Sequence, residues 1–344
     1  PAHAVGAVTV SVTNPDGQSG ILANAFTYTS AVVAPTIASL NFALGDPAGG
    51  GLSITATGTS LDAVTVTIGG NSATITAQSP TSVTVTLPAH AAGTVSFVAT
   101  NIAGSASSSF EYWSPVQISS IVAVWDAEKG ITNSSGVTAW VDQTGNGHDL
   151  AESSAKFTYT ATAFGTLHGL TSDGSKQLLT SRTVQNLGRS LFWVAKYTSS
   201  KSTRVDYTGN APLTVIGDAS GSVNNNAGHD AGQLCYMNYD GVTPWAATTR
   251  GSSLNDGTPR LYGFTHSLAG DVKAYVGTSQ QGTTNTSQTY DTTAAAFSAI
   301  GQGFGGNTDG FVGTIGAALV VNAIISGSDL TKLNAWSQQR WGTP

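Results

Sequence analysis

The chain has 344 residues, of which 9% are charged and 40% are hydrophobic, and its formal net charge is −6. This much apolar material excludes a disordered chain, which combines low hydrophobicity with high net charge. With only three glutamates, the chain is also a poor match to a helical bundle or coiled coil, and its Thr, Ser and Gly content favours β-strands with polar outer faces.

The distribution of charge also excludes some partners. The 13 Lys and Arg residues are scattered and none lies in residues 1–117, whereas neutralising nucleic-acid phosphates takes clustered basic residues. No run of 18 apolar residues exists, so we expect no membrane insertion. The start, Pro1-Ala2-His3-Ala4, lacks the basic and apolar regions of a signal peptide, which we expect to be absent or already removed. Cys235 is the only cysteine, so no intrachain disulfide is expected, and its apolar surroundings predict a buried thiol.

An internal repeat organises the first third of the chain. The opening Pro1-Ala2-His3-Ala4-Val5-Gly6 reappears as Pro88-Ala89-His90-Ala91-Ala92-Gly93, and Phe26-Thr27-Tyr28 matches Phe110-Glu111-Tyr112. We therefore expect residues 1–30 to be the C-terminal part of a module and residues 31–114 to be a complete copy. On this interpretation the chain is truncated or further modules lie upstream.

Within the complete copy, residues 64–68 (Val-Thr-Val-Thr-Ile) and 83–87 (Val-Thr-Val-Thr-Leu) alternate strictly between apolar residues and threonine. Such alternation predicts half-buried strands, and the intervening turn signals Gly69-Gly70-Asn71 and Ser79-Pro80-Thr81 indicate a β-sandwich.

These strands, together with the closing Phe110-Glu111-Tyr112, resemble the IPT/TIG immunoglobulin-like module. The resemblance covers residues 31–114 well and residues 1–30 as a fragment. It implies a spacer role. Some copies elsewhere contact partners or nucleic acid, but the absence of basic residues favours the spacer.

After Trp113-Ser114-Pro115 the composition shifts: all Lys and Arg and six of the seven Trp lie beyond residue 117. Three segments of this second part form a recognisable order of motifs. They are residues 140–147 (Trp-Val-Asp-Gln-Thr-Gly-Asn-Gly), Asp173-Gly174 before a strand, and a closing strand and helix that end at Trp341-Gly342. This order resembles the concanavalin A-like, laminin-G-like jelly roll. The resemblance implies one domain over residues 118–344, although residues 200–300 match poorly.

The residues of the last segment predict a helix that packs on the sandwich. Ser328 is a candidate N-cap, Asp329 suits the positive helix start and Arg340 suits its end. Leu330, Leu333, Trp336 and Trp341 fall on one helical face, which we expect to bury two indoles. Asp142 and Asp173 are interpreted as turn-fixing residues, and His148 and His168 as polar turn residues.

No constellation in the sequence indicates catalysis. Glycoside hydrolysis needs two facing carboxylates, but the E-x-D-x-x-E strand motif is absent, and Glu128 and Glu152 flank loops. A lyase would need a Tyr/His pair with Arg in a groove, and the sequence does not show whether such residues meet. G-x-S-x-G, H-E-x-x-H, P-loop and C-x-x-C motifs are all missing. We therefore predict a non-enzymatic protein without catalytic residues.

Residues 224–245 combine aromatic rings, which stack on pyranose rings, with amide and carboxylate groups that hydrogen-bond hydroxyls. The candidate ligand-binding residues are Asn225, His229, Asp230, Tyr236, Asn238, Tyr239, Asp240 and Trp245. The alternative is an ordinary half-buried strand with a polar loop. Calcium is common in this superfamily and Asp218, Asp230 and Asp240, with Asn225, are weak candidate ligands. No established calcium-loop spacing is present, so we predict no metal and no cofactor.

The sequence thus predicts an all-β protein in which IPT/TIG spacers precede a larger jelly-roll sandwich with a short C-terminal helix. The first functional hypothesis is a cell-surface or virion-surface adhesion protein whose lectin-like domain recognises glycans, as on phage fibres, spikes or head decorations, or bacterial adhesins. The alternative is a structural decoration or filament subunit that makes protein–protein contacts. A polysaccharide hydrolase or lyase is the third hypothesis.

Overall fold

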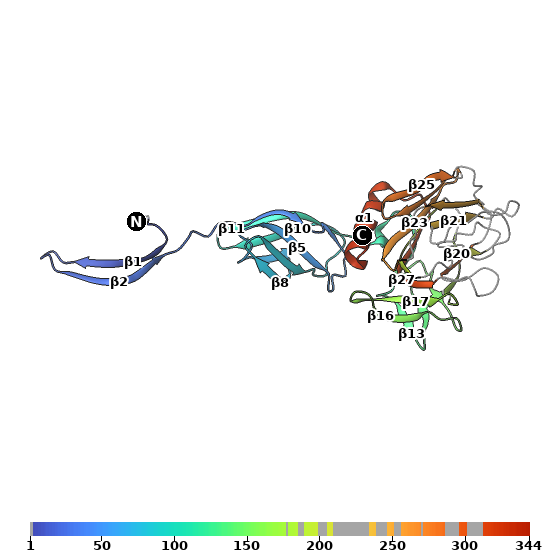
Figure 1. Ribbon diagram of the computed structural model, residues 1–344, viewed down its shortest axis with the longest axis horizontal. Helices are drawn as coiled ribbons and strands as arrows, with labels where there is room; N and C mark the ends of the chain where they lie inside the picture. The colour runs from blue at the N-terminus through green and yellow to red at the C-terminus, as the bar shows by residue number, and fades with distance from the viewer. Residues whose placement is uncertain are drawn as a thin grey trace. The chain divides into compact units, whose positions relative to one another are not determined.

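The computed structural model describes residues 3–176, 178–184, 189–198, 205–208, 234–238, 246–250, 256–269, 271–285, 296–300 and 312–344. It confirms an all-β fold with an immunoglobulin-like sandwich, a larger jelly-roll sandwich and one C-terminal helix (Figure 1). The chain divides into two compact units. The first comprises Pro1–Ala43, Ser53–His90 and Thr94–Phe110, and the second comprises Leu44–Leu52, Ala91–Gly93 and Glu111–Pro344. No helix in the described part is long and apolar enough to cross a membrane.

The first unit is built from antiparallel strands (Figure 1). β1 pairs with β2, β3-β5-β9-β8 form a four-stranded sheet, and β11-β10-β6-β7 are neighbours in a second sheet. The strands are β1 Gly6–Thr13, β2 Ser19–Tyr28, β3 Thr36–Leu40, β5 Ser53–Thr59, β6 Thr65–Ile68, β7 Asn71–Ser72, β8 Thr74–Ser79, β9 Ser82–Thr86, β10 Gly93–Asn101 and β11 Gly104–Tyr112.

The alternation in the sequence becomes the core of this sandwich. Val66 and Ile68 on β6, and Val83 and Val85 on β9, are buried, while the threonines between them face outward. Both predicted turns are confirmed, because Ile68 pairs with Asn71 across Gly69-Gly70 and Ser79 pairs with Ser82 across Pro80-Thr81.

The internal repeat is also visible in the backbone. The hairpin β1–β2 occupies the same place in the repeat as β10–β11. Gly6 and Gly93, which the repeat aligns, open these hairpins with φ of 142° and 138°. This is a left-handed region that side chains rarely adopt, so both copies use glycine for the same backbone conformation.

The second unit contains the other strands and the helix. They are β4 Leu44–Gly45, β12 Ile121–Asp126, β13 Ile131–Asn133, β14 Val137–Trp140, β15 Leu150–Ala151, β16 Thr158–Phe164, β17 Leu167–Asp173, β18 Leu178–Val184, β19 Arg189–Tyr197, β20 Val205–Thr208, β21 Leu234–Asn238, β22 Ala246–Arg250, β23 Arg260–His266, β24 Val272–Val276, β25 Ser279–Asn285, β26 Ala296–Ile300, β27 Val312–Val321, the 3-10 turn η1 Pro115–Gln117 and α1 Gly327–Trp341.

Two large sheets enclose the core of this unit. One has the order β16-β17-β27-β19-β23-β24-β25, with β12 also paired to β27, and the other has the order β13-β14-β15-β18-β26-β20. β27 is central because its successive residues bond β17 and then β12 along one edge and β19 along the other. The strand is almost entirely buried, and Trp125, Trp140 and Trp193 fill the core around it.

The C-terminal helix packs on this core, as the sequence predicts. Leu330, Leu333, Trp336 and Trp341 are buried. At Gly316 of β27 an added Cβ would lie 2.6 Å from Cε3 of Trp341, so glycine is needed there for the helix to approach the sheet.

The predicted N-cap is wrong by two residues. Ser326, not Ser328, has the extended backbone of an N-cap, and its Oγ accepts the Asp329 amide at 3.0 Å. Two serines flank Gly327, and the first of them is the N-cap. An N-cap side chain accepts the backbone amide two or three residues later, and Ser326 lies three residues before Asp329. At the other end Gly342 closes the helix in the left-handed conformation, with φ of 66°.

Asp142 and Asp173 fix turns as predicted. The buried Asp142 carboxylate accepts the amides of Val124 at 3.0 Å, Thr144 at 3.0 Å and His148 at 3.2 Å. It therefore ties the glycine-containing loop before β15 to β12. His148 follows this loop as expected, but His168 does not lie in a turn, because β17 includes it.

Candidate functional site

Most of the predicted ligand-binding residues lie outside the described residues. These are Asn225, His229, Asp230, Tyr239, Asp240 and Trp245, together with the calcium candidate Asp218. Tyr236 and Asn238 belong to β21, where they pair with Thr248 and Ala246 of β22. The glycan and calcium sites therefore stay predictions. Among the described residues, no group of three His, Cys, Asp or Glu side chains could hold a metal ion.

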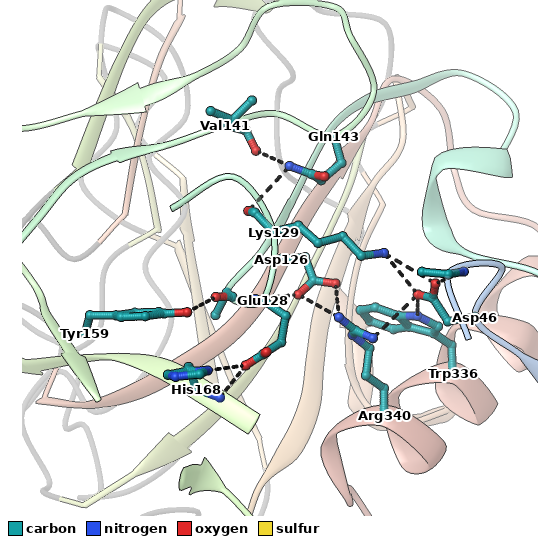
Figure 2. A network of polar contacts seen from close by, with 12 residues as sticks. Asp46, Asp126, Glu128, Lys129, Val141, Gln143, Tyr159, His168, Trp336 and Arg340 are labelled. Carbon is teal, nitrogen blue, oxygen red and sulfur yellow. Dashed lines mark hydrogen bonds and ion pairs between the residues drawn. The ribbon is translucent and has the colours of Figure 1, made fainter. Parts of the chain in front are cut away.

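The described part of the second unit contains a buried ionic cluster formed by Asp46, Asp126, Lys129 and Arg340 (Figure 2). Arg340 Nη2 lies 2.9 Å from Oδ2 of Asp126, and its Nη1 lies 3.7 Å from Oδ2 of Asp46. Lys129 Nζ lies 3.3 Å from Oδ1 of Asp46, and Trp336 donates its indole N–H to Asp46 at 3.4 Å. Three distant stretches of sequence thus meet at one carboxylate.

The electrostatics of this cluster balance, with two carboxylates against two cations. The Asp46 side chain is 2% exposed and that of Arg340 is 6% exposed, so neither charge is hydrated to any extent. Burial raises the pKa of Asp126, and the charges of Arg340 and Lys129 oppose that rise. Each carboxylate also accepts a backbone amide, from Ala48 at 2.8 Å for Asp46 and from Glu128 at 2.9 Å for Asp126. Removal of one partner from such a buried pair leaves the other charge without compensation, which is strongly destabilising, so the cluster ties the parts of the second unit to one another.

A second polar group, formed by Glu128, His168 and Tyr159, adjoins the cluster (Figure 2). It lies where one edge of β27 changes its pairing partner from β12 to β17. Glu128 Oε1 accepts both the backbone amide and the Nδ1 of His168, the latter at 2.9 Å. The His168 ring stacks on Tyr159, with centroids 4.6 Å apart and planes at 4° (Figure 2). The Tyr159 hydroxyl donates to the carbonyl of Ala127 at 3.0 Å. Glu128, two residues beyond the end of β12, is thereby bound to β17.

The structure thus brings together a tyrosine and a histidine, which are the residue types that a lyase would use, and their rings stack on each other. The Tyr159 hydroxyl is engaged by a carbonyl, and burial and the charges of Glu128 and Asp126 raise its pKa. The nearby guanidinium of Arg340 is bound to Asp126 and Asp46.

Most other described cations are also engaged in the fold. Lys332 pairs with Glu111, Arg260 with Asp256 and Lys176 with Asp173, while Lys156 and Lys196 donate to the carbonyls of Ser134 and Ala163. The described surface therefore offers few free positive charges to an anionic partner.

The sequence interpretation puts Asp46 in the first module and Glu128 in the larger domain, and it assigns neither carboxylate its partner. Asp46 lies in the glycine-rich stretch 45–51, and no residue pattern connects it to Arg340, 294 positions later (340 minus 46). Glu128 was correctly predicted to flank a loop, but its partner His168 was placed in a turn. For Glu128 the sequence offers one hint: it is one of only three glutamates in the chain, so a specific role for it is worth considering.

Comparison with known proteins identifies part of the chain. Residues 35–112 match the IPT/TIG domain family, which confirms the resemblance for that part. None of the curated proteins matches this chain.

Several solved structures are similar to it. Domain 4 of an extracellular arabinanase from Geobacillus stearothermophilus, solved with arabinotriose, is 15% identical with a TM-score of 0.46, and the match covers 63% of this chain and all (100%) of that one. A Trypanosoma rangeli sialidase in complex with sialic acid is 13% identical with a TM-score of 0.42, over 73% of this chain and 43% of that one. The binding domain of botulinum neurotoxin serotype D is 11% identical with a TM-score of 0.45, over 65% and 54%.

Proposed function

We propose that this protein is a non-enzymatic, surface-exposed binding protein in which IPT/TIG modules are spacers and the larger sandwich recognises glycans. Its place would be outside the cell or on a virion, as part of an adhesin, fibre, spike or head decoration. The composition supports this place, because a Thr-, Ser- and Gly-rich β chain with a single cysteine is durable without disulfide chemistry.

The spacer role is supported by charge and family together. Residues 1–117 contain four acidic residues and no basic ones, and residues 35–112 match the IPT/TIG family. Strands β8 and β11 of this unit expose mainly threonine and serine, which offer little for ionic recognition.

The glycan role rests on one observation, the concentration of rings and hydrogen-bonding side chains in residues 224–245. Binding to neutral sugars uses aromatic faces and amide groups, and it does not need free charge. This agrees with the described cations of the second unit, most of which are already paired within the fold.

A glycan array with the full chain tests this proposal. We expect saturable binding to a restricted set of glycans, and we expect Trp245→Ala and Tyr239→Ala to reduce it at least tenfold. Phe26→Ala is the matched control, since it removes a ring that is 54% exposed in the first unit, and it should leave binding unchanged. Binding that survives loss of both Trp245 and Tyr239 would place the site elsewhere, and absence of binding to any glycan would refute the role.

The same preparation tests the remaining parts of the proposal. We expect no release of reducing ends or unsaturated sugars from bacterial polysaccharides, and no change in Tm on addition of a chelator. Product release would support the hydrolase or lyase hypothesis, and a chelator-dependent Tm would support calcium binding.

One observation favours the second candidate, a structural subunit that makes protein–protein contacts. Apolar side chains of β1 and β2 are exposed, including Val12 at 66% and Leu22 at 67%. Particles or filaments that contain this chain, resolved by electron microscopy, would distinguish a subunit held by such contacts from a free binding domain.

A further inference from the structure

The hairpin β1–β2 carries one apolar face. Directly paired residues of antiparallel strands lie on the same side, and Val8 pairs with Phe26, Val10 with Leu22 and Gly6 with Tyr28. We call this the hairpin face, and its side chains are Val8, Val10, Val12, Leu22, Phe26 and Tyr28. Four of them are well exposed, with 42% for Val10, 66% for Val12, 67% for Leu22 and 54% for Phe26.

The internal repeat shows what such a face does in a complete module. By the 87-residue offset, Val10 and Val12 correspond to Phe97 and Ala99 of β10 (97 minus 10 and 99 minus 12), which are both 0% exposed. Phe26 corresponds to Phe110 of β11, which is 1% exposed. The same positions are therefore inside in one copy and in solvent in the other.

The complete copy also shows the chemistry of the cover. Opposite β10 and β11 stands the sheet β3-β5-β9-β8, whose Ile54, Ala56, Val83 and Val85 are all buried with 0% exposure. In addition, β6 pairs along the edge of β10. Among the described residues β1 has no strand on its corresponding edge.

We propose that the hairpin face is a docking surface for the strands that complete an IPT/TIG-type module. The occupant is a sheet with β-branched residues at every second position, like β5 and β9, together with one strand that pairs with the edge of β1. Docked in this way, β1–β2 is the last hairpin of a sandwich like the one over residues 35–112.

This occupant fits better than a second copy of the chain. Two hairpins packed face to face would cover the apolar side chains but leave both β1 edges with unpaired backbone groups, which is unfavourable for exposed strands. The other strands of a module cover the apolar hairpin face and also pair with the backbone groups at the edge of β1. Such a cover is needed because an isolated two-stranded hairpin is at best marginally stable.

The repeat allows a direct test. A duplicate of residues 31–87 is fused in front of Pro1 of the full chain, which recreates the natural order because Leu87 precedes Pro88 in the complete copy. Hydrogen exchange of residues 6–28 is then compared between the fused and unfused chains. We expect exchange in the fused chain to slow at least tenfold, and binding of a hydrophobic dye to fall.

Two controls keep this test decisive. A fusion whose added copy carries threonine in place of both Val83 and Val85 should leave the hairpin as fast to exchange as in the unfused chain. The unfused chain should sediment as a monomer. A hairpin that exchanges equally fast with and without the fused segment would overturn the proposal, as would an unfused chain that dimerises with its hairpin protected.

Discussion

Replacing Asp46 by alanine should destabilise the second unit, although this residue lies within the 35–112 range of the IPT/TIG match. The substitution removes the carboxylate that faces Lys129 at 3.3 Å and Arg340 at 3.7 Å, and it removes the acceptor of the Ala48 amide. Arg340 then keeps Asp126 as its only described carboxylate partner.

The size of the effect follows from burial. Loss of one partner of a buried ion pair costs about 3–5 kcal/mol, because the other charge stays buried without compensation. Arg340, at 6% side-chain exposure, bears most of this cost, whereas Lys129 is 33% exposed and can be hydrated. Since Asp126 still neutralises part of the guanidinium charge, we expect about 3 kcal/mol, at the lower end of the range.

Urea unfolding with hydrogen exchange read by mass spectrometry measures this effect and locates it. In Asp46→Ala, exchange should accelerate in α1 and β12, and the stability difference should persist in 0.5 M salt because buried pairs are screened little. Asp62→Ala is the matched control, since Asp62 is an exposed acid of the first unit and its loss should cost under about 0.5 kcal/mol. Unchanged exchange in α1, with a cost below about 1 kcal/mol, would refute the argument that Asp46 supports the helix.

Three further predictions concern the second unit. Gly316→Ala places a methyl 2.6 Å from Trp341 and should cost about 1–3 kcal/mol in urea unfolding; Gly327→Ala, with open space around its Cβ, is the control, and equal stability of the two would contradict the packing argument. Ser326→Ala should lower stability by about 1 kcal/mol and Ser326→Gly by only a few tenths, so equal losses would argue against the capping bond. Burial raises the pKa of Tyr262 to about 12, so the folded chain keeps a proton that the unfolded chain releases above about pH 10. The stability linked to that proton is complete below about pH 10 and is lost as pH rises through about 12, roughly 2–3 kcal/mol in all. Tyr262→Phe should remove this part of the alkaline slope, and an unchanged slope would contradict it.

The strand pattern was readable from the sequence because it depends on local chemistry. Alternation of Val with Thr in residues 64–68 and 83–87 places each residue on a known side of a strand, and turn residues mark where strands end. The spacing of Leu330, Leu333, Trp336 and Trp341 likewise identified the buried face of α1. The choice between Ser326 and Ser328 as N-cap could not be predicted from the sequence. It depends on a tertiary contact, because the Ile325 amide donates to Ser190 of β19 directly before the helix begins.

The polar clusters depended on the tertiary structure for a different reason. Coulomb attraction and hydrogen bonds act between groups that the fold brings close, and no period in the sequence encodes a contact between Asp46 and Arg340 or between Glu128 and His168. The repeat in the sequence identified β1–β2 as the hairpin that corresponds to β10–β11. Only the structure showed that the apolar face of β10–β11 is covered and that of β1–β2 is exposed. Composition and periodicity by themselves determined an all-β chain whose basic residues all lie beyond residue 117. Burial, which depends on every neighbouring strand, decided what the charged residues do.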